Sequence, residues 1–69
     1  MSVFGVREVG EWALRFDVRP VERHAVAARL RAAAGAGVEE VVPGESSVLV
    51  RFAPGSRVEA DRFLELANA

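Results

Sequence analysis

The chain has 69 residues, of which 51% are hydrophobic and 28% charged, and its formal net charge is −1. This length allows one domain, residues 1–69, with a single small core, and the hydrophobic content excludes a disordered chain. The lack of cysteine excludes a disulfide framework and a cysteine-based metal site, and the charge gives no general attraction to nucleic-acid phosphates.

Membrane insertion and secretion are not expected either. No apolar run approaches the roughly 20 residues that are needed to cross a bilayer. The first residues, MSVFGVREVGEW, lack the basic and apolar regions of a signal peptide, so we expect a cytoplasmic protein. All nine basic residues are arginines, and lysine, isoleucine and tyrosine are absent. This bias is typical of a GC-rich genome, and the arginine count alone therefore identifies no site.

Two extended runs, residues 3–9 and 12–18, begin the chain. The second run alternates, with Trp12, Leu14 and Phe16 on one face and with Ala13, Arg15 and Asp17 on the other. Such alternation predicts a half-buried strand. Gly10 lies where a turn is needed, and the two runs therefore predict a hairpin.

A helix is predicted over residues 21–34. Pro20 suits the first turn of a helix, and apolar residues recur at helical spacing at Val26, Leu30 and Ala33. A left-handed stop is expected from the glycines that follow, Gly35 and Gly37.

A second hairpin is predicted within residues 37–54, which read GVEEVVPGESSVLVRFAP. Its apolar runs, residues 38–43 and 48–52, flank the turn-forming residues 43–46. β-branched residues favour strands. Period-two alternation then places Val48, Val50 and Phe52 on one face, and Ser47, Leu49 and Arg51 on the other.

The last predicted element is a second helix. Residues 56–59, Ser-Arg-Val-Glu, match a capping box, in which the serine oxygen accepts a free backbone amide. Apolar residues follow at spacings of three and four, at Ala60, Phe63, Leu64 and Ala67.

These elements predict an α+β fold of two hairpin-plus-helix units, ββαββα. The simplest packing is one four-stranded, mainly antiparallel sheet with both helices on one face. The expected core consists of Trp12, Leu14, Phe16, Val26, Leu30, Val42, Val48, Val50, Phe52, Phe63 and Leu66. The other face of the sheet is expected to be uncovered, and it would carry Ala13, Arg15, Leu49 and Arg51.

A KipI-like family resemblance lies in two motifs. VREVGEWALRF is similar to the opening of the KipI-like proteins, a family also described as allophanate hydrolase subunit 1 or as a component of 5-oxoprolinase. The second motif, GVEEVVPGESSVLVRFAPG, resembles that family's hairpin signature at Gly37, Val38, Glu40, Val41, Val42, Pro43, Ser47, Leu49, Val50 and Pro54. Departures from the family pattern are Glu11 for aspartate, Gly44-Glu45 for Ala-Tyr, and Ala53 for aspartate.

The resemblance covers the N-terminal domain of that family and ends before its cyclophilin-like second domain. It implies a role beside partner subunits in 5-oxoproline, urea or allophanate metabolism, or in inhibition of a sporulation histidine kinase. Two functions follow as hypotheses. The first is a stand-alone interaction or accessory module, and the second is a small subunit or catalyst of an amide- or lactam-processing system whose site is completed at an interface. A nucleic-acid binder is a third hypothesis, but exposed stacking aromatics and positive charge are lacking.

Most polar residues have a structural interpretation. His24 is the only histidine, which excludes a histidine pair for a metal, and we predict no metal or cofactor site. Serines at a turn are common, and this explains Ser46 and Ser47. The second hairpin carries three glutamates, Glu39, Glu40 and Glu45. They are either paired carboxylates for acid–base chemistry or a solvated acidic edge. Trp12 is either a core anchor or a binding aromatic.

The expected binding residues are Arg7, Arg15, Leu49 and Arg51. If the first strand keeps register with the second, the three arginines lie on the uncovered face. There they would hold an anionic ligand or an acidic protein partner. We expect association with a protein partner or with a second copy.

Overall fold

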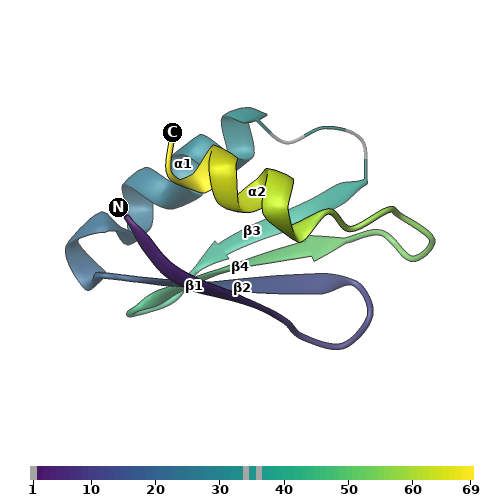
Figure 1. Ribbon diagram of the computed structural model, residues 1–69, viewed down its shortest axis with the longest axis horizontal. Helices are drawn as coiled ribbons and strands as arrows, with labels where there is room; N and C mark the ends of the chain where they lie inside the picture. Colours follow the sequence, from purple (N-terminus) through teal and green to yellow (C-terminus); the bar gives the residue numbers. More distant parts are fainter. Residues whose placement is uncertain (1, 34, 36) are drawn as a thin grey trace.

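The computed structural model describes residues 2–33, 35 and 37–69. Its elements are β1 (Val3–Glu8), β2 (Ala13–Val18), the 3-10 helix η1 (Pro20–Glu22), α1 (Arg23–Ala33), β3 (Val38–Pro43), β4 (Ser47–Phe52) and α2 (Ala60–Ala67). The strands form one antiparallel sheet in the order β1-β2-β4-β3. Both helices lie on the same side of this sheet (Figure 1). The predicted α+β fold with ββαββα order is confirmed.

Each helix packs on the hairpin of the other unit. The helix α1 follows β1 and β2, yet it contacts β3 and β4, and α2 follows β3 and β4 but contacts β1. The two helices also pack against each other. Because neither unit covers its own hairpin fully, the two units depend on one another for a common core.

The two hairpins repeat the same register. In each, the outer strand carries one extra residue near its start, a β-bulge, at Phe4 in β1 and at Glu39 in β3. The inner strands β2 and β4 pair with each other, and Arg15 lies opposite Leu49 at the middle of that ladder. These two residues hold equivalent positions in their units, so an approximate twofold axis that relates the two units passes between them.

The core lies between the sheet and the helices. Its buried apolar residues are Val3, Leu14, Phe16, Val18, Val26, Ala27, Leu30, Val41, Val48, Val50, Phe52, Phe63 and Ala67. The rings of Phe52 and Phe63 meet edge to face, with centroids 5.1 Å apart and an interplanar angle of 80°. Of the residues predicted for this core, all are buried except Trp12, Val42 and Leu66.

Those three positions differ from the prediction in different ways. Val42 is 41% exposed and Val41 is buried in its place, so the prediction for Val42 is wrong. The bulge at Glu39 is the reason, because the extra residue shifts the alternation by one and turns Val38 and Val41 to the helices. Trp12 precedes β2, and Trp12 and Leu66 are both partly buried at the margin of the core.

The helix boundaries differ from the predicted ones. The first helical segment begins as η1 at Pro20, with Val21 87% exposed, and α1 starts only at Arg23. Ala34, the predicted last residue of this helix, lies outside the described residues, and so does the side chain of Ala33. Gly37 has the expected left-handed conformation, with φ of 100°.

The predicted capping box is wrong. The helix α2 begins at Ala60, its N-cap is Glu59, and no side chain caps it. The Ser56 hydroxyl instead donates to the Gly37 carbonyl at 3.5 Å. A Cβ on Gly37 would lie 2.8 Å from that hydroxyl oxygen, so Ser56 forms a contact between two loops.

Among the residues that the structure describes, no helix is long and apolar enough to span a membrane.

Candidate functional site

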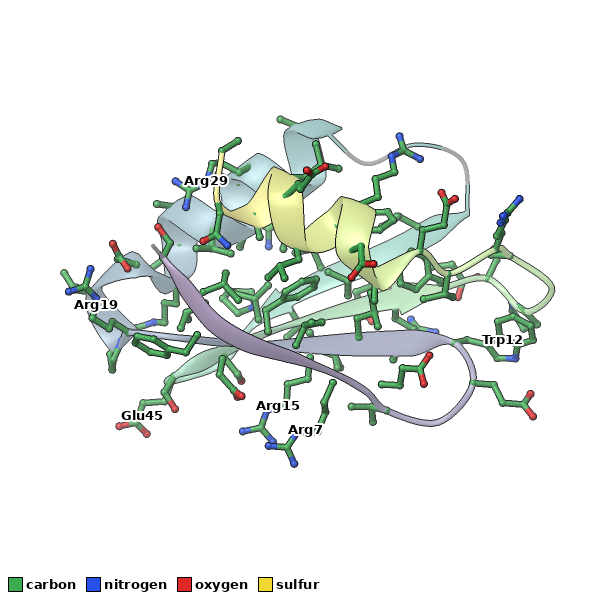
Figure 2. The ribbon with its side chains drawn as sticks, viewed as in Figure 1. Arg7, Trp12, Arg15, Arg19, Arg29 and Glu45 are labelled. Atoms are coloured by element: carbon green, nitrogen blue, oxygen red, sulfur yellow. The ribbon has the colours of Figure 1, made fainter. Side chains whose placement is uncertain are left out.

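The uncovered side of the sheet is called the open face from here on. Its side chains alternate along the strands with those of the core, and they belong to Arg7, Ala13, Arg15, Asp17, Glu40, Val42, Ser47, Leu49 and Arg51. All four predicted binding residues therefore lie on one surface. In Figure 2, the labelled Arg7 and Arg15 project from the sheet on the side away from both helices.

One row of side chains crosses the open face at its centre. Arg7 pairs with Arg15, Arg15 with Leu49, and Leu49 with Val42. Neighbouring strands lie about 4.8 Å apart, so the row is about 14 Å long. Its half on β1 and β2 is basic and its half on β4 and β3 is apolar. We call these four residues the central row.

The basic half of the central row is poorly neutralised. Arg7 forms no ion pair or side-chain hydrogen bond with any residue that the structure describes. The Nε of Arg15 lies 3.6 Å from an Asp17 carboxylate oxygen, an ion pair without a hydrogen bond. Arg7 and Arg15 are direct cross-strand neighbours, and like charges in that arrangement are destabilising. The fold thus keeps two adjacent positive charges, of which only that of Arg15 is paired with a carboxylate among the described residues.

Arg51 is held in a different way. Its Nε and Nη2 donate to the same Glu40 oxygen at 3.1 and 2.8 Å, and its Nη1 donates to Glu39 at 3.2 Å. The bulge makes this possible, because it sets both glutamates opposite Arg51. The hydrogen bond to Glu40, followed by the charges of Glu40 and Glu39, raises the pKa of Arg51 above its ordinary value. Arg51 is therefore a neutralised group at the rim of the central row.

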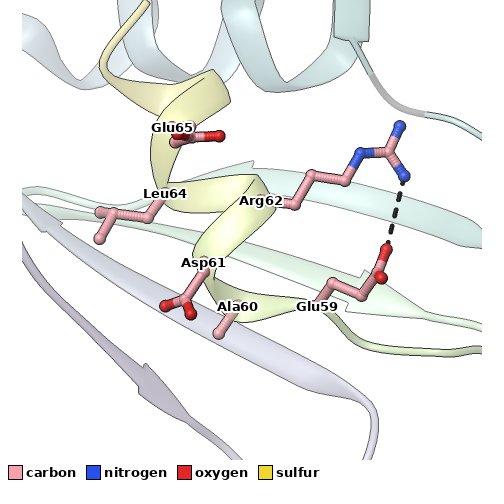
Figure 3. Close-up of a pocket in the computed structure, with 6 residues that line it drawn as sticks. All are labelled: Glu59, Ala60, Asp61, Arg62, Leu64 and Glu65. Atoms are coloured by element: carbon pink, nitrogen blue, oxygen red, sulfur yellow. Dashed lines mark ion pairs between the residues drawn. The ribbon is translucent and has the colours of Figure 1, made fainter.

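A shallow depression lies on the helical side, and Figure 3 shows it. It surrounds the first turns of α2 and is lined by Glu59, Ala60, Asp61, Arg62, Leu64 and Glu65. Arg62 lies 3.7 Å from Glu59 in an ion pair, and the remaining side chains leave the helix in different directions (Figure 3). The carboxylates do not converge on one point, and this depression gives no argument for chemistry.

The other predicted candidates do not come together. Glu39 and Glu40 bind Arg51, whereas Glu45 is exposed in the turn at the opposite end of β4 (Figure 2). His24 is exposed on α1. The backbone carbonyl of Ser46 accepts from the Val18 amide at 3.0 Å, a contact between the turn of the second hairpin and the end of β2. In the described part of the chain, no three histidine, aspartate or glutamate side chains group as metal ligands.

Three residues that the sequence did not single out protect the ends and edges of the fold. Arg31 of α1 donates to the Val41 carbonyl on the outer strand β3 at 2.9 Å. The side-chain oxygen of Asn68 accepts from the backbone amides of Ser2 and Val3, at 3.0 and 2.9 Å, where β1 begins. Arg29 donates from Nε to the Ala67 carbonyl at 2.9 Å, at the end of α2. The sequence offered one signal for the contacts of Arg29 and Arg31, because both arginines lie on a helix without an acidic partner.

The chain matches no family model, no curated protein and no solved structure. Of the residues that carry the resemblance to the KipI-like hairpin signature, all but Gly37 and Pro54 lie in β3 and β4. In this structure they serve the hairpin itself. Gly37 supplies a left-handed residue before β3, and Glu40 neutralises Arg51.

Proposed function

We propose that the chain is a protein-interaction or accessory module, as the KipI-like resemblance implies, and that the open face is its binding surface. The observation that carries the proposal is the central row. Four neighbouring residues form a continuous strip across all four strands, half basic and half apolar, on the face that no helix covers. An apolar patch bordered by charged groups is a common composition of a protein interface.

A lone leucine on the surface would not support this proposal, since such leucines are common on proteins. Leu49, however, is half-buried and lies next to Val42, which is 41% exposed. Phe4, at 66% exposure, precedes Gly5, whose partner Asp17 belongs to the open face. Accessible apolar groups therefore occur at both the middle and the border of this surface, and they favour contact with a partner.

The edges of the sheet are less suited to a partner than the face. Both outer strands carry a bulge, which disrupts regular pairing with an added strand. Arg31 already donates a hydrogen bond to a backbone carbonyl of β3, and the Asn68 side chain already accepts from two backbone amides at the start of β1. Addition of a strand would have to displace these contacts, whereas binding on the open face displaces none of them.

Site-specific photo-crosslinking tests the proposal. A photoreactive residue is placed at Leu49 on the open face or at Val21, which is 87% exposed in the helical layer. We expect a discrete protein adduct from position 49 and none from position 21, and its mass tells a second copy from another protein. Equal adducts from both positions, or none from position 49, would contradict the proposal.

A further inference from the structure

We propose that the partner presents an acidic and partly apolar peptide segment, with its carboxylates at Arg7 and Arg15 and its apolar side chains at Leu49 and Val42. This inference rests on the proposed function and names the chemistry that the open face recognises. It also limits the predicted set of binding residues, because Arg51 has its own carboxylates and is not available to the segment.

The strongest reason is the contrast between the arginines of the open face. Arg51 uses three nitrogens on two glutamates of its own chain. Arg7 and Arg15 face each other across the β1–β2 ladder, and their one ion pair to an aspartate is the contact of Arg15 with Asp17 at 3.6 Å. A carboxylate that is bound between the two guanidinium groups would relieve their repulsion and use their forked donor geometry.

The apolar half of the central row sets the second requirement. A small inorganic anion would neutralise the arginines and leave Leu49 and Val42 in water. A segment with acidic residues followed by apolar ones covers both halves of a row that is about 14 Å long. Such a span corresponds to a few residues of peptide, since an extended chain advances about 3.3 Å per residue.

The charges around the central row argue against nucleic acid. Three carboxylates lie on or beside the open face, on Asp17, Glu39 and Glu40. Only two arginines of this face are left for phosphates, while nucleic-acid binding needs several neutralised phosphates. A second copy fits no better, because Glu39 and Glu40 of that copy are bound to its own Arg51 and leave Asp17 as its carboxylate on this surface.

A displayed library of random twelve-residue peptides, selected against the full chain, tests this inference. The matched variants are Arg7→Gln with Arg15→Gln on the open face, and Arg57→Gln with Arg62→Gln on the helical side. Both pairs remove two positive charges, and Arg57 and Arg62 are exposed, with side chains 89% and 58% accessible. Leu49→Glu reports whether a selected peptide uses the open face at all.

We expect the wild-type protein to select peptides that are enriched in aspartate and glutamate and that no longer bind the Leu49→Glu variant. A synthetic copy of the strongest binder should lose about tenfold or more in affinity towards Arg7→Gln/Arg15→Gln, because charge-assisted hydrogen bonds are lost. It should change less than about twofold towards Arg57→Gln/Arg62→Gln, whose charges are distant and exposed. Replacing the acidic residues of the peptide by their amides should weaken binding to the wild type to a similar extent.

Four results would overturn the inference. Peptides that depend on Leu49 but lack acidic enrichment would refute the acidic partner and leave the proposed function intact. Peptides that bind Leu49→Glu unchanged, or a selection that yields no binder, would contradict both proposals. A twelve-nucleotide single-stranded RNA that binds through Arg7 and Arg15 more tightly than the selected peptides would identify the surface as a nucleic-acid site.

Discussion

Replacing Phe52 by alanine should destabilise the fold strongly. Phe52 is 2% exposed at the end of β4, and its ring meets Phe63 of α2 at 5.1 Å. Removing a buried phenylalanine costs about 3–5 kcal/mol, of which about 0.5–1.5 kcal/mol is the edge-to-face contact. A domain of this size has a total stability of about 3–10 kcal/mol, so the variant should be close to unfolding at 25 °C.

Urea denaturation measures this effect, with Trp12 as the single tryptophan reporter. The carbonyl of Trp12 accepts from the Phe52 amide at 2.7 Å, which places the probe beside the substitution. Phe4→Ala is the matched control, because Phe4 is 66% exposed, and its cost should stay within about 0.5 kcal/mol. A double-mutant cycle with Phe63→Ala isolates the ring contact. Equal losses for Phe52→Ala and Phe4→Ala would refute the assigned core and the register of β4.

The register and the loop contacts give three further predictions. Val41→Asp should cost more than about 2 kcal/mol, whereas Val42→Asp should cost less than about 1 kcal/mol, because the bulge turns only Val41 inward. Reversed costs in urea denaturation would disprove the bulge. Asn68→Ala should cost about 1–2 kcal/mol, since the amides of Ser2 and Val3 lose their acceptor, and unchanged amide exchange at Val3 would contradict this. Ser56→Ala should cost less than about 0.5 kcal/mol, as its hydroxyl makes one long contact and caps no helix; a loss of about 1 kcal/mol, the value for an N-cap, would restore the capping box.

The strands and the two hairpins were predictable because strict alternation and turn residues are local signals. Residues 12–16 and 48–52 alternate in period two, and this pattern indicated both hairpins and the residues of the open face. The bulge at Glu39 was not predictable in the same way. Two adjacent glutamates within an apolar run fit either face of a strand, and only their shared contact with Arg51 decides between them. The wrong face for Val42 followed from that ambiguity.

The candidate site was predictable in its position and not in its charge balance. Arg7, Arg15 and Arg51 share a face by alternation alone, and nothing in the sequence distinguishes them. Their difference depends on which carboxylates the folded chain brings near each one. The prediction for Ser56 failed for a related reason, because a capping box in the sequence competes with tertiary contacts, and the loop at Gly37 accepts the hydroxyl here.

The effect of Leu49→Glu on folding and binding tests the central claim most directly. Leu49 lies at the middle of the central row, opposite Arg15, and Val21→Glu adds the same charge on the helical side. We predict that both variants keep a free energy of unfolding within about 1 kcal/mol of the wild type, and that only Leu49→Glu loses the partner trapped from position 49. If Leu49→Glu unfolds, Leu49 belongs to the core and the open face does not exist as described. If it folds and binds as the wild type does, the binding surface lies elsewhere on the molecule.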